Sequence, residues 1–498
     1  MTLLRRLAFL AAAAACSLPA EVSLPALFAD HMVIQRDLPV HVWGRAGDGE
    51  AVSVEFQGNS RNTQADDLGF WSVYLPPVAA GGPYELTVKG TNAITVHDVL
   101  VGDVWIASGQ SNMEFALQDA NNAQAEIAAA NDDGIRAFHV HRAVASHTVL
   151  DVTADSWEPA TPQTAGRFSA VAYFFARDLR RKSHVPIGIL ESYWGGTPAE
   201  AWTSLASLSA DASLMPVFAT WARVNEDAVR TKMRRKNQLE RWKAEVARAK
   251  AEGKPAPGRP WAGNDDDSWS PAGLFNAMIA PLTHFPIRGA IWYQGENNAT
   301  EEGAPTYPRL FQTMIQDWRK AWGDDDFPFL FVQLANFKTG PNSRWPELRD
   351  AQRQALNLRH TGMAVTIDIG DAGDIHPKNK QDVGARLALA ARAVVYGENI
   401  EYSGPIFRQA IPEGGSLRVR FDHAGGLKSK NAVLRGFEVA GADRKYQPAE
   451  ARIDGSTVVV SSSSVPAPVL VRYAWADNPE ADLYNSADLP ASPFRSGE

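Results

Sequence analysis

One stretch decides the fold of this chain: GDVWIASGQSNMEFAL, residues 102–117. Its mostly apolar residues 104–107 predict a short buried strand that ends at Ser108-Gly109. The pattern becomes helical from Met113 onward. Ser111 is therefore expected on a turn between a strand and a helix, exposed at the N-terminus of the helix.

A serine at such a turn has two interpretations. Ser111-Asn112-Met113-Glu114 fits the S-x-x-E pattern of a capping box, in which the hydroxyl accepts a hydrogen bond from an orphan backbone N–H. Alternatively, the hydroxyl is a nucleophile, and nearby N–H groups and the helix dipole stabilise an oxyanion. The stretch alone favours the cap, so the choice depends on what the rest of the chain brings to this turn.

Strand-like apolar runs alternate with helical patterns downstream of this stretch. The runs cover residues 104–107, 187–193, 289–293, 329–334 and 364–369. Most are separated by segments with apolar residues at helical spacing. Alternating β and α elements predict a parallel, doubly wound sheet, so we expect an α/β domain over residues 102–397.

The segments on either side of this domain have a different hydrophobic pattern. Short alternating runs split by Gly, Pro and Asp predict an N-terminal β-sandwich-like domain over residues 21–101. Alternation returns after residue 397, which predicts a C-terminal β-domain and an irregular tail over residues 398–498. Residues 204–270 interrupt the α/β domain with a charge-rich helical pattern and a Pro- and Gly-rich loop, so they are expected to form a helical insertion.

Composition and charge limit the partners of the chain. Its net charge of -8 over 498 residues gives no support for binding to nucleic acid or to an anionic membrane. Residues 1–20 combine Arg5-Arg6 with an apolar run too short to span a bilayer, which is the layout of a secretory signal peptide. Export to the periplasm or the exterior is therefore expected, and no later segment is apolar enough to cross a membrane.

The single cysteine, Cys16, lies inside this leading segment, so no disulfide is expected in the mature chain. Anchoring as a lipoprotein through Cys16 is an alternative. The residues before Cys16 lack the leucine that is usual in a lipoprotein processing site, which favours simple export.

In an open parallel sheet, ligands bind outside the carboxyl ends of the strands. Polar residues follow the predicted strands at that edge: Ser111, Trp194-Gly195-Gly196-Thr197, Gln294-Gly295-Glu296-Asn297-Asn298, Asn336, and then Asp371, Asp374 and His376. The topology therefore gathers a hydroxyl, paired glycines, amides, carboxylates and an imidazole in one place.

Acyl transfer requires such a set of groups. A serine hydroxyl needs a neutral imidazole to take its proton, and a carboxylate to orient that imidazole, roles that fit Ser111, His376 and Asp374. Glu296 is an alternative orienting acid. The tetrahedral oxyanion needs N–H donors, and the predicted donors are Ser111, Gly196 and Gln294.

Further residues near the motifs are candidates for supporting roles. The predicted substrate-binding residues are Trp194, Trp292, Tyr293 and Asn112. The flat faces of aromatic side chains suit a sugar ring. Packing in the core explains the aromatic residues, including Trp202, equally well. Additional candidates for the site are Gln110, Gly195, Glu296 and Asp371.

Other interpretations of these motifs are simpler. Asp374-Ile-His376-Pro377 also suits the start of a helix, and Gly195-Gly196 also suits a plain turn. His139 and His141 fit a structural role better than a metal site. Because HExxH, CxxC and EF-hand patterns are absent, and GxGxxG is absent at the first strand, neither a metal nor a cofactor is expected.

Four sequence blocks together resemble the bacterial sialate O-acetylesterase family, within the wider SGNH hydrolases. The blocks are GQSNME at 109–114, WGGT at 194–197, WYQGE at 292–296 and DIHP at 374–377. LFADHMVIQR at 27–36 and LRDAQ at 348–352 are similar to the family as well. The resemblance covers most of the chain outside the helical insertion. It implies a flavodoxin-like SGNH hydrolase domain, a Ser-His-Asp triad without a metal, and removal of acetyl groups from sugars.

The resemblance assigns the nucleophile to Ser111, the base to His376 and the acid most directly to Asp374. The chain departs from the general SGNH pattern in two places. That pattern has its acid three residues before the histidine, where this chain has Gly373, and the nearest acids are Asp374 and Asp371. It also has an asparagine in the third block, where this chain offers Gln294-Gly295-Glu296, so Glu296 remains a candidate for the acid.

The expected function is that of an exported carbohydrate O-acetylesterase that hydrolyses acetyl esters on sugars through an acetyl-enzyme intermediate. One alternative keeps the fold and changes the substrate to acetylated xylan or another hemicellulose. Another alternative is a non-catalytic glycan-binding protein on the same scaffold. The sequence leaves the oligomeric state open.

Overall fold

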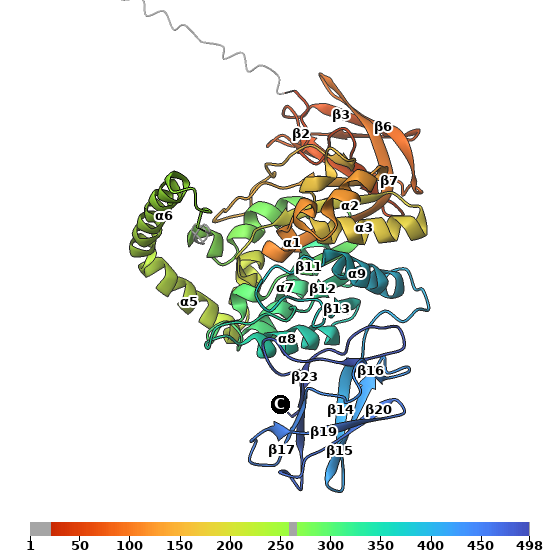
Figure 1. Cartoon of the computed structure of the whole chain (residues 1–498). Coiled ribbons are helices and arrows are strands. Elements are labelled where there is room, and N and C mark those ends of the chain that lie inside the picture. Colours follow the sequence, from red (N-terminus) through yellow and green to blue (C-terminus); the bar gives the residue numbers. More distant parts are fainter. Residues whose placement is uncertain (1–20, 258–265, 498) are drawn as a thin grey trace, which may run out of the picture.

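The computed structural model describes residues 21–257 and 266–497. The expected signal peptide with Cys16 lies outside the described residues, and so does part of the loop that closes the insertion. An α/β layer lies between two β-rich ends of the molecule, and two helices project from its side (Figure 1). The α/β layer carries the sheet edge at which the sequence places its polar motifs.

Six parallel strands form the central sheet, in the order β13-β12-β11-β7-β10-β8. They are β7 (Ala93–Gly109), β8 (Asp132–His139), β10 (Ile187–Tyr193), β11 (Gly289–Tyr293), β12 (Phe329–Val332) and β13 (Thr361–Ala364), and β9 (Glu158–Ala160) adds an antiparallel edge to β8. Leaving out β8, the strands lie in the order 2-1-3-4-5 along the chain, which is flavodoxin-like, with its switch point between β7 and β11. The predicted doubly wound sheet is confirmed.

The last strand of this sheet lies earlier than predicted. β13 ends at Ala364, whereas the apolar run suggested a strand over 364–369. The reason lies in Thr366, whose hydroxyl donates to the carbonyl of Gln333 and whose own carbonyl accepts from the N–H of Ile369. These bonds form a turn and end the ladder.

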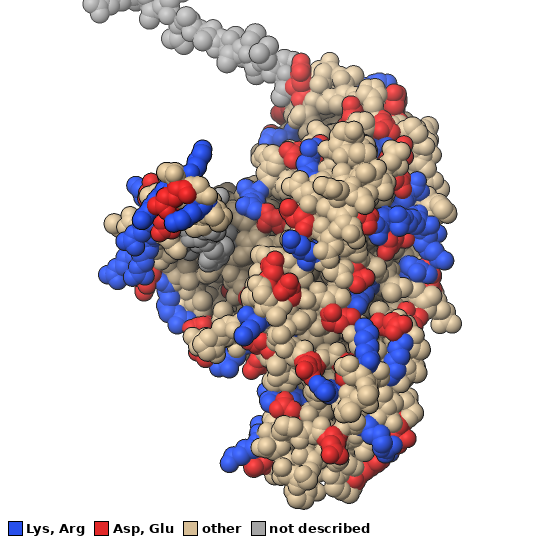
Figure 2. Space-filling model, in the orientation of Figure 1, with Lys and Arg blue, Asp and Glu red and all other residues tan. Residues whose placement is uncertain are grey.

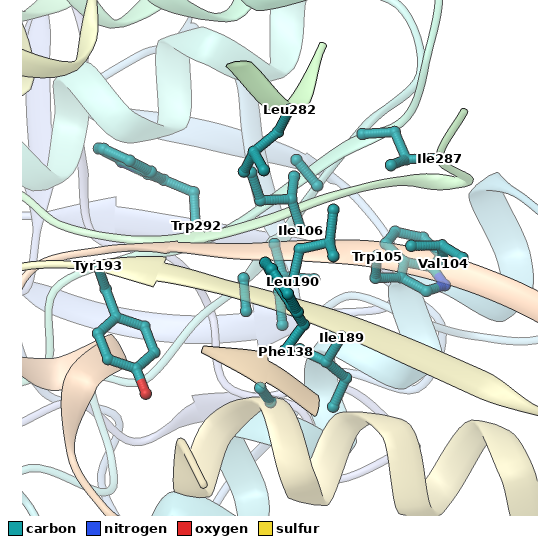
Figure 3. Close-up of a cluster of buried hydrophobic side chains, with 14 of the residues drawn as sticks. Val104, Trp105, Ile106, Phe138, Ile189, Leu190, Tyr193, Leu282, Ile287 and Trp292 are labelled. Atoms are coloured by element: carbon teal, nitrogen blue, oxygen red, sulfur yellow. The ribbon is translucent and has the colours of Figure 1, made fainter. Parts of the chain in front are cut away.

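Helices cover both faces of the sheet. On one face α3 (Ala170–Ser183) packs against α9 (Lys380–Val394), and on the other lies α7 (Tyr307–Trp322), with α8 (Trp345–Gln354) packed against it. Figure 3 shows the apolar core along β7, β10 and β11. Its tryptophans face opposite ways: Trp105 contacts Phe175 of α3, and Trp292 contacts Trp318 of α7. The helical spacing of apolar residues therefore buries one face of each helix, as predicted.

The N-terminal part shares a strand with the central sheet. Its own strands are β1 (Val33–Gln35), β2 (Val40–Arg45), β3 (Ala51–Phe56), β4 (Asn59–Gln64), β5 (Phe70–Leu75) and β6 (Gly81–Lys89). β7 pairs with β1 and β6 in its first half and with β10 and β11 in its second half. The domain boundary expected between residues 101 and 102 is therefore wrong, because it falls inside one strand whose Val101 and Val104 belong to one continuous core.

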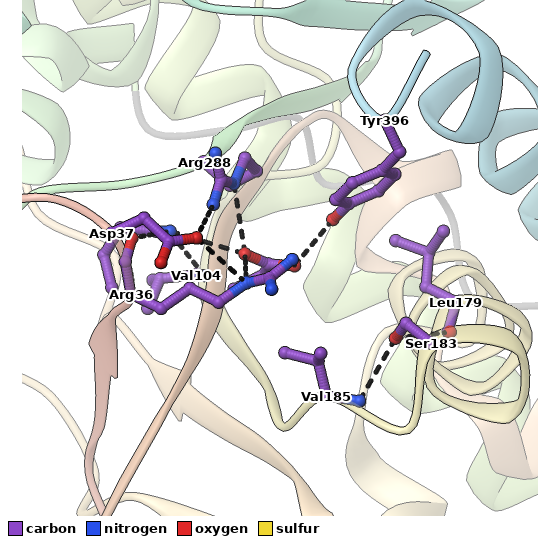
Figure 4. Close-up of polar contacts among 10 residues, drawn as sticks. Arg36, Asp37, Val104, Leu179, Ser183, Val185, Arg288 and Tyr396 are labelled. Carbon is purple, nitrogen blue, oxygen red and sulfur yellow. Dashed lines mark hydrogen bonds and ion pairs between the residues drawn. The ribbon is translucent and has the colours of Figure 1, made fainter. Parts of the chain in front are cut away.

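A buried carboxylate ties this strand to three other parts of the chain. Asp103 of β7 accepts hydrogen bonds from Arg36 Nε at 2.8 Å, Arg288 Nε at 3.1 Å and the Tyr396 hydroxyl at 2.9 Å. Figure 4 shows these side chains converging from the segments that follow β1, precede β11 and follow α9. The cluster fixes β7 at the junction of the two sheets.

The inserted segment, residues 204–270, is largely helical in its described part. It contains α4 (Leu205–Ser209), α5 (Met215–Glu226) and α6 (Ala228–Ala251), of which α5 and α6 project from the body. Figure 2 shows basic and acidic side chains mixed along these two helices. The basic run at 232–236 therefore lies on a helix that also carries acidic residues.

The C-terminal β-module has a hydrophobic core of its own. Its strands are β14 (Ile406–Glu413), β15 (Ser416–Asp422), β16 (Lys428–Ser429), β17 (Phe437–Ala440), β18 (Gln447–Pro448), β19 (Glu450–Asp454), β20 (Thr457–Ser461), β21 (Leu470–Tyr473), β22 (Leu483–Tyr484) and β23 (Phe494–Arg495). The tail also reaches the α/β layer, since Arg349 of α8 donates to the carbonyls of Ala476 and Asp477. Within residues 21–257 and 266–497, no helix is long and apolar enough to cross a membrane.

Candidate active site

Ser111 and His376 meet at the carboxyl end of the central sheet, although 265 residues separate them. Ser111 directly follows the turn after β7 and begins the short helix α1 (Ser111–Glu114). Its Oγ lies 2.8 Å from His376 Nε2. Burial and the positive charge of Lys380 lower the pKa of His376, which favours the neutral imidazole that can accept the hydroxyl proton.

The capping box is not formed. The N-cap of α1 is Gln110, and its side chain makes no capping hydrogen bond. Ser111 Oγ contacts the imidazole instead, and Glu114 Oε2 accepts from the N–H of Gly195 at 2.7 Å. The structural interpretation of the S-x-x-E pattern is therefore wrong, because both of its side chains are engaged outside the helix.

Two glycines allow the backbone to close around the serine. Gly109 has φ +138, and a Cβ there would lie 2.1 Å from the Tyr293 carbonyl oxygen. A Cβ on Gly195 would lie 3.1 Å from Ser111 Cβ. Position 109 therefore requires glycine for the close approach of β11, whereas a side chain on Gly195 would press on Ser111 and Glu114.

Three acids were candidates for orienting the imidazole. Asp374 Oδ1 lies 3.8 Å from His376 Nδ1 and accepts from the His376 backbone N–H at 2.8 Å. Asp371 accepts instead from the N–H of Gly373, and Glu296 accepts from Asn112. Of these three acids, all within the described residues, Asp374 alone contacts His376.

The predicted oxyanion donors divide into two groups. The backbone N–H groups of Ser111 and Gly196 have no acceptor among the described residues, so both are available. Gln294 is buried, and its Nε2 donates to the Thr197 carbonyl at 3.2 Å and to Asn298 Oδ1 at 2.7 Å. The prediction for Gln294 is therefore wrong, because its amide already donates to Thr197 in the loop after β10 and to Asn298 in the segment after β11.

Asn297 is a residue of this edge to which the sequence motifs assign no role. Its Nδ2 donates to the Gly196 carbonyl at 2.8 Å, and its backbone N–H donates to Gln110 Oε1 at 3.2 Å. Gln110 and Asn297 thus tie the loop after β11 to the turn that carries Ser111. The signal that points to Asn297 is its place directly after the third block, at the same sheet edge.

A buried polar chain runs beside the serine. Lys380 Nζ donates to Asn112 Oδ1 at 2.5 Å, and Asn112 Nδ2 donates to Glu296 Oε1 at 2.5 Å and to the Ile375 carbonyl at 3.0 Å. Burial lowers the pKa of Lys380 to about 7 and raises the pKa of Glu296. Asn112 is therefore wrongly predicted as a substrate contact, because both ends of its buried amide hold this chain together.

The aromatic candidates are mostly part of the core. Trp202, Trp292 and Tyr293 are fully buried, so the prediction that Trp292 and Tyr293 face a sugar is wrong. Trp194 is partly exposed, and the Arg142 guanidinium lies 5.6 Å from its ring centroid. Trp194 is thus the aromatic residue of the four that a substrate can reach.

The two histidines on β8 and just after it have carboxylate partners. His141 Nε2 lies 2.8 Å from Asp155 Oδ1, and His139 Nδ1 lies 3.6 Å from Glu191 Oε2. In the part of the chain that the structure describes, no group of three or more His, Cys, Asp or Glu side chains is placed to hold a metal ion.

The geometry combines a hydroxyl in contact with an imidazole, a carboxylate beside that imidazole, and the backbone N–H groups of Ser111 and Gly196, which have no acceptor among the described residues. These groups suit attack on an ester carbonyl at the switch point of a flavodoxin-like sheet. Fold and site together define a carboxylic-ester hydrolase.

Comparisons with known proteins agree with this class. The sialate O-acetylesterase of Mus musculus is 31% identical in an alignment of 517 positions, which covers 93% of this chain and 92% of that protein. The chain therefore belongs to the sialate O-acetylesterase family, and the resemblance seen in the sequence blocks is confirmed. The sialate O-acetylesterase of Homo sapiens is 29% identical, and the alignment covers 93% of this chain and 90% of that protein.

A family model and a solved structure extend the comparison. The model for carbohydrate esterases described as sialic acid-specific acetylesterase matches residues 261–393. The crystal structure of a carbohydrate acetylesterase from Xanthomonas citri is similar with a TM-score of 0.82 and 43% sequence identity, covering 96% of this chain and 99% of that one. The similarity to this structure spans all three parts of the chain.

Proposed function

We propose that this chain is an exported carbohydrate O-acetylesterase that works through Ser111, His376 and Asp374. The observation that carries the proposal is the 2.8 Å contact between Ser111 Oγ and His376 Nε2. Export rests on the signal-peptide pattern of residues 1–20. The names of the relatives support an acetylated sugar as the substrate.

The first half of the reaction transfers the acetyl group to the enzyme. Ser111 Oγ attacks the acetyl carbonyl carbon while His376 Nε2 takes the hydroxyl proton. The carbonyl oxygen becomes an oxyanion, which the N–H groups of Ser111 and Gly196 stabilise. The bond from carbon to the sugar oxygen then breaks, and His376 returns the proton to that oxygen, which releases the sugar hydroxyl.

The second half removes the acetyl group. A water molecule gives a proton to His376 and attacks the acetyl-Ser111 carbonyl, and the same N–H groups stabilise the new oxyanion. The bond to Ser111 Oγ breaks, the proton returns to Oγ, and acetate leaves. Asp374 holds the imidazole and stabilises its charge in both halves.

Replacing the nucleophile tests the proposal. Ser111→Ala is expected to lower acetate release from 4-nitrophenyl acetate by about 10³-fold or more. Ser108→Ala is a matched control, because Ser108 lies near the end of β7, three residues before Ser111, and its buried Oγ has no hydrogen-bond partner among the described residues. A Ser111→Ala protein that hydrolyses this ester at the wild-type rate would rule out the mechanism.

Covalent labelling tests the alternative of a non-catalytic glycan-binding protein. A fluorophosphonate probe reacts with an activated serine and is expected to label the wild-type chain at Ser111 and leave Ser111→Ala unlabelled. Absence of labelling in a folded wild-type protein would favour the binder. Acetate release from acetylated xylan and from O-acetyl sialic acid, measured side by side, separates the two substrate alternatives.

A further inference from the structure

A cavity of about 400 Å³ lies between the insertion and the α/β layer. One wall is α5, with Val217 and Trp221, and the opposite wall is the segment that follows β11, from Glu296 to Thr306. Its size falls within the range of about 300–1,000 Å³ that is usual for ligand pockets. The insertion therefore builds a wall of a ligand-sized site.

The cavity adjoins the catalytic groups. Asn297 lines it and donates through Nδ2 to the Gly196 carbonyl, and Trp269 lines it and donates through Nε1 to the same carbonyl at 2.8 Å. Gly196 is also the residue whose N–H, which has no acceptor among the described residues, is a proposed oxyanion donor. Glu296 also lines the cavity and bonds to Asn112, the neighbour of Ser111. Contacts through Gly196 and Asn112 thus join the cavity lining to the residues around Ser111.

The lining suits a sugar that carries no charge. Trp221 and Trp269 provide aromatic surface, which packs against the C–H faces of sugar rings. The carboxylate of Glu302 can accept hydrogen bonds from sugar hydroxyl groups, whereas those of Glu200 and Glu296 already accept from Asn298 and Asn112. The described lining residues include no Lys, Arg or His, so a sugar carboxylate would find no cationic partner among them.

We propose that this cavity binds a neutral sugar unit linked to the acetylated sugar. The inference rests on the proposed function and adds the substrate class, which is a neutral oligosaccharide and not an anionic monosaccharide such as a sialic acid. The acetyl group enters beside Ser111, and the next unit of the chain lies against Trp221 of the insertion. α5 therefore determines specificity and takes no part in bond breaking.

The test compares substrates with and without a neighbouring sugar. Trp221→Ala is expected to lower the ratio of kcat/KM for acetylated xylo-oligosaccharides to kcat/KM for 4-nitrophenyl acetate by about tenfold, mainly through KM. Asn225→Ala is the matched control, because Asn225 is exposed on the same helix and does not line the cavity. It is expected to leave the ratio at the wild-type value.

A binding experiment separates the two proposals. Titration calorimetry of Ser111→Ala with xylohexaose is expected to show binding that weakens about tenfold when Trp221→Ala is added. Suppose that the wild-type chain hydrolyses acetyl esters but that Trp221→Ala changes neither the ratio of kcat/KM values nor the binding of xylohexaose. The subsite proposal is then wrong, while the proposed esterase function is unaffected. A wild-type preference for O-acetyl sialic acid over acetylated xylo-oligosaccharides would also overturn the subsite. If Ser111→Ala keeps wild-type activity, the proposed function fails, and the subsite proposal fails with it.

Discussion

The backbone N–H of Gly195 donates a 2.7 Å hydrogen bond to Oε2 of Glu114, three residues after the proposed nucleophile. The other oxygen of this carboxylate pairs with the guanidinium of Arg142. A carboxylate of α1 thus holds the loop after β10 against Ser111. The free N–H of Gly196 is the next one along that loop, so its position depends on this bond.

Removing the carboxylate is expected to loosen the oxyanion site. Glu114→Ala is expected to lower kcat by about 10–100-fold with a smaller change in KM, since a hydrogen bond to a charged group contributes about 1.5–3 kcal/mol. Steady-state kinetics with 4-nitrophenyl acetate checks this. Arg142→Ala, which spares the bond to Gly195, is expected to have a much smaller effect. Equal losses of kcat in Glu114→Ala and Arg142→Ala would mean that activity depends on the ion pair between these two residues and not on the bond to Gly195.

The charge of Lys380 is expected to set the acid limb of the pH profile. Burial and Lys380 both lower the pKa of His376, and activity needs the neutral imidazole, so the rate falls as pH drops through that pKa. Lys380 has a pKa of about 7 and is charged over the acid limb. Lys380→Met is therefore expected to move the limb in kcat/KM to higher pH. Lys378→Met, which removes an exposed lysine nearby, is expected to leave it in place, and an unmoved limb in Lys380→Met would contradict this account.

The orienting acid is expected to be Asp374. Because Asp374 contacts His376, Asp374→Asn is expected to lower kcat by about 10²-fold, whereas Asp371→Asn is expected to stay near the wild-type rate. Stopped assays of acetate release on both purified variants check the order. A larger loss in Glu296→Gln than in Asp374→Asn, in a protein of unchanged thermal stability, would transfer the role to Glu296.

The Asp103 cluster is expected to stabilise the fold above about pH 4. Burial raises the pKa of Asp103, but the hydrogen bond from Arg36 and the charges of Arg288 and Arg36 outweigh it, so the pKa lies below its usual value. A carboxyl with a lowered folded-state pKa adds stability above the pKa of the unfolded chain, about 3.9, and loses it as pH falls through the folded value. Asp103→Asn is expected to lower the free energy of unfolding by about 2–3 kcal/mol at pH 7.

Urea denaturation at pH 7 and at pH 3 checks this expectation. The deficit of Asp103→Asn relative to wild type should shrink at the lower pH. Asp37→Asn is the matched control, because Asp37 lies within 3.7 Å of Arg36 and 3.5 Å of Arg288 but is 59% exposed. Exposed ion pairs contribute about 0–1 kcal/mol, so its effect should be small at both values of pH.

The sequence predicts the pairing of Ser111 with His376 because topology brings both residues to one edge of the sheet and the resemblance to the sialate O-acetylesterase family assigns them to one catalytic group. Each follows the carboxyl end of a strand in a parallel sheet, so the rule for open sheets applies whatever the side chains do. The role of Gln294 fails for the opposite reason. Its position at the edge is predicted correctly, but the direction of its amide depends on Thr197 and Asn298, which tertiary packing brings to it.

Burial explains the other differences. Trp292 and Tyr293 end a strand that is covered on both faces, so their aromatic rings complete the core. The sequence does not predict Lys380 near the site, because a lysine is ordinarily exposed. It is buried only because α9 packs against the sheet. The predicted domain boundary at residue 101 is wrong because the change in sequence pattern there marks only the junction of two sheets. A single strand, β7, pairs with strands of both sheets across that junction.

The 17-residue strand β7 has a consequence for how this protein can be rebuilt. The N-terminal β-module cannot be cut away or exchanged as a unit, because its removal would divide the strand that ends at the catalytic turn. The C-terminal module has a core of its own and, among the described residues, shares no strand with the central sheet, but it holds the α/β layer through the contacts of Arg349 with the carbonyls of Ala476 and Asp477. Recombination can therefore exchange the C-terminal end of the enzyme if these contacts of Arg349 are kept, while the N-terminal end must change residue by residue together with the active site.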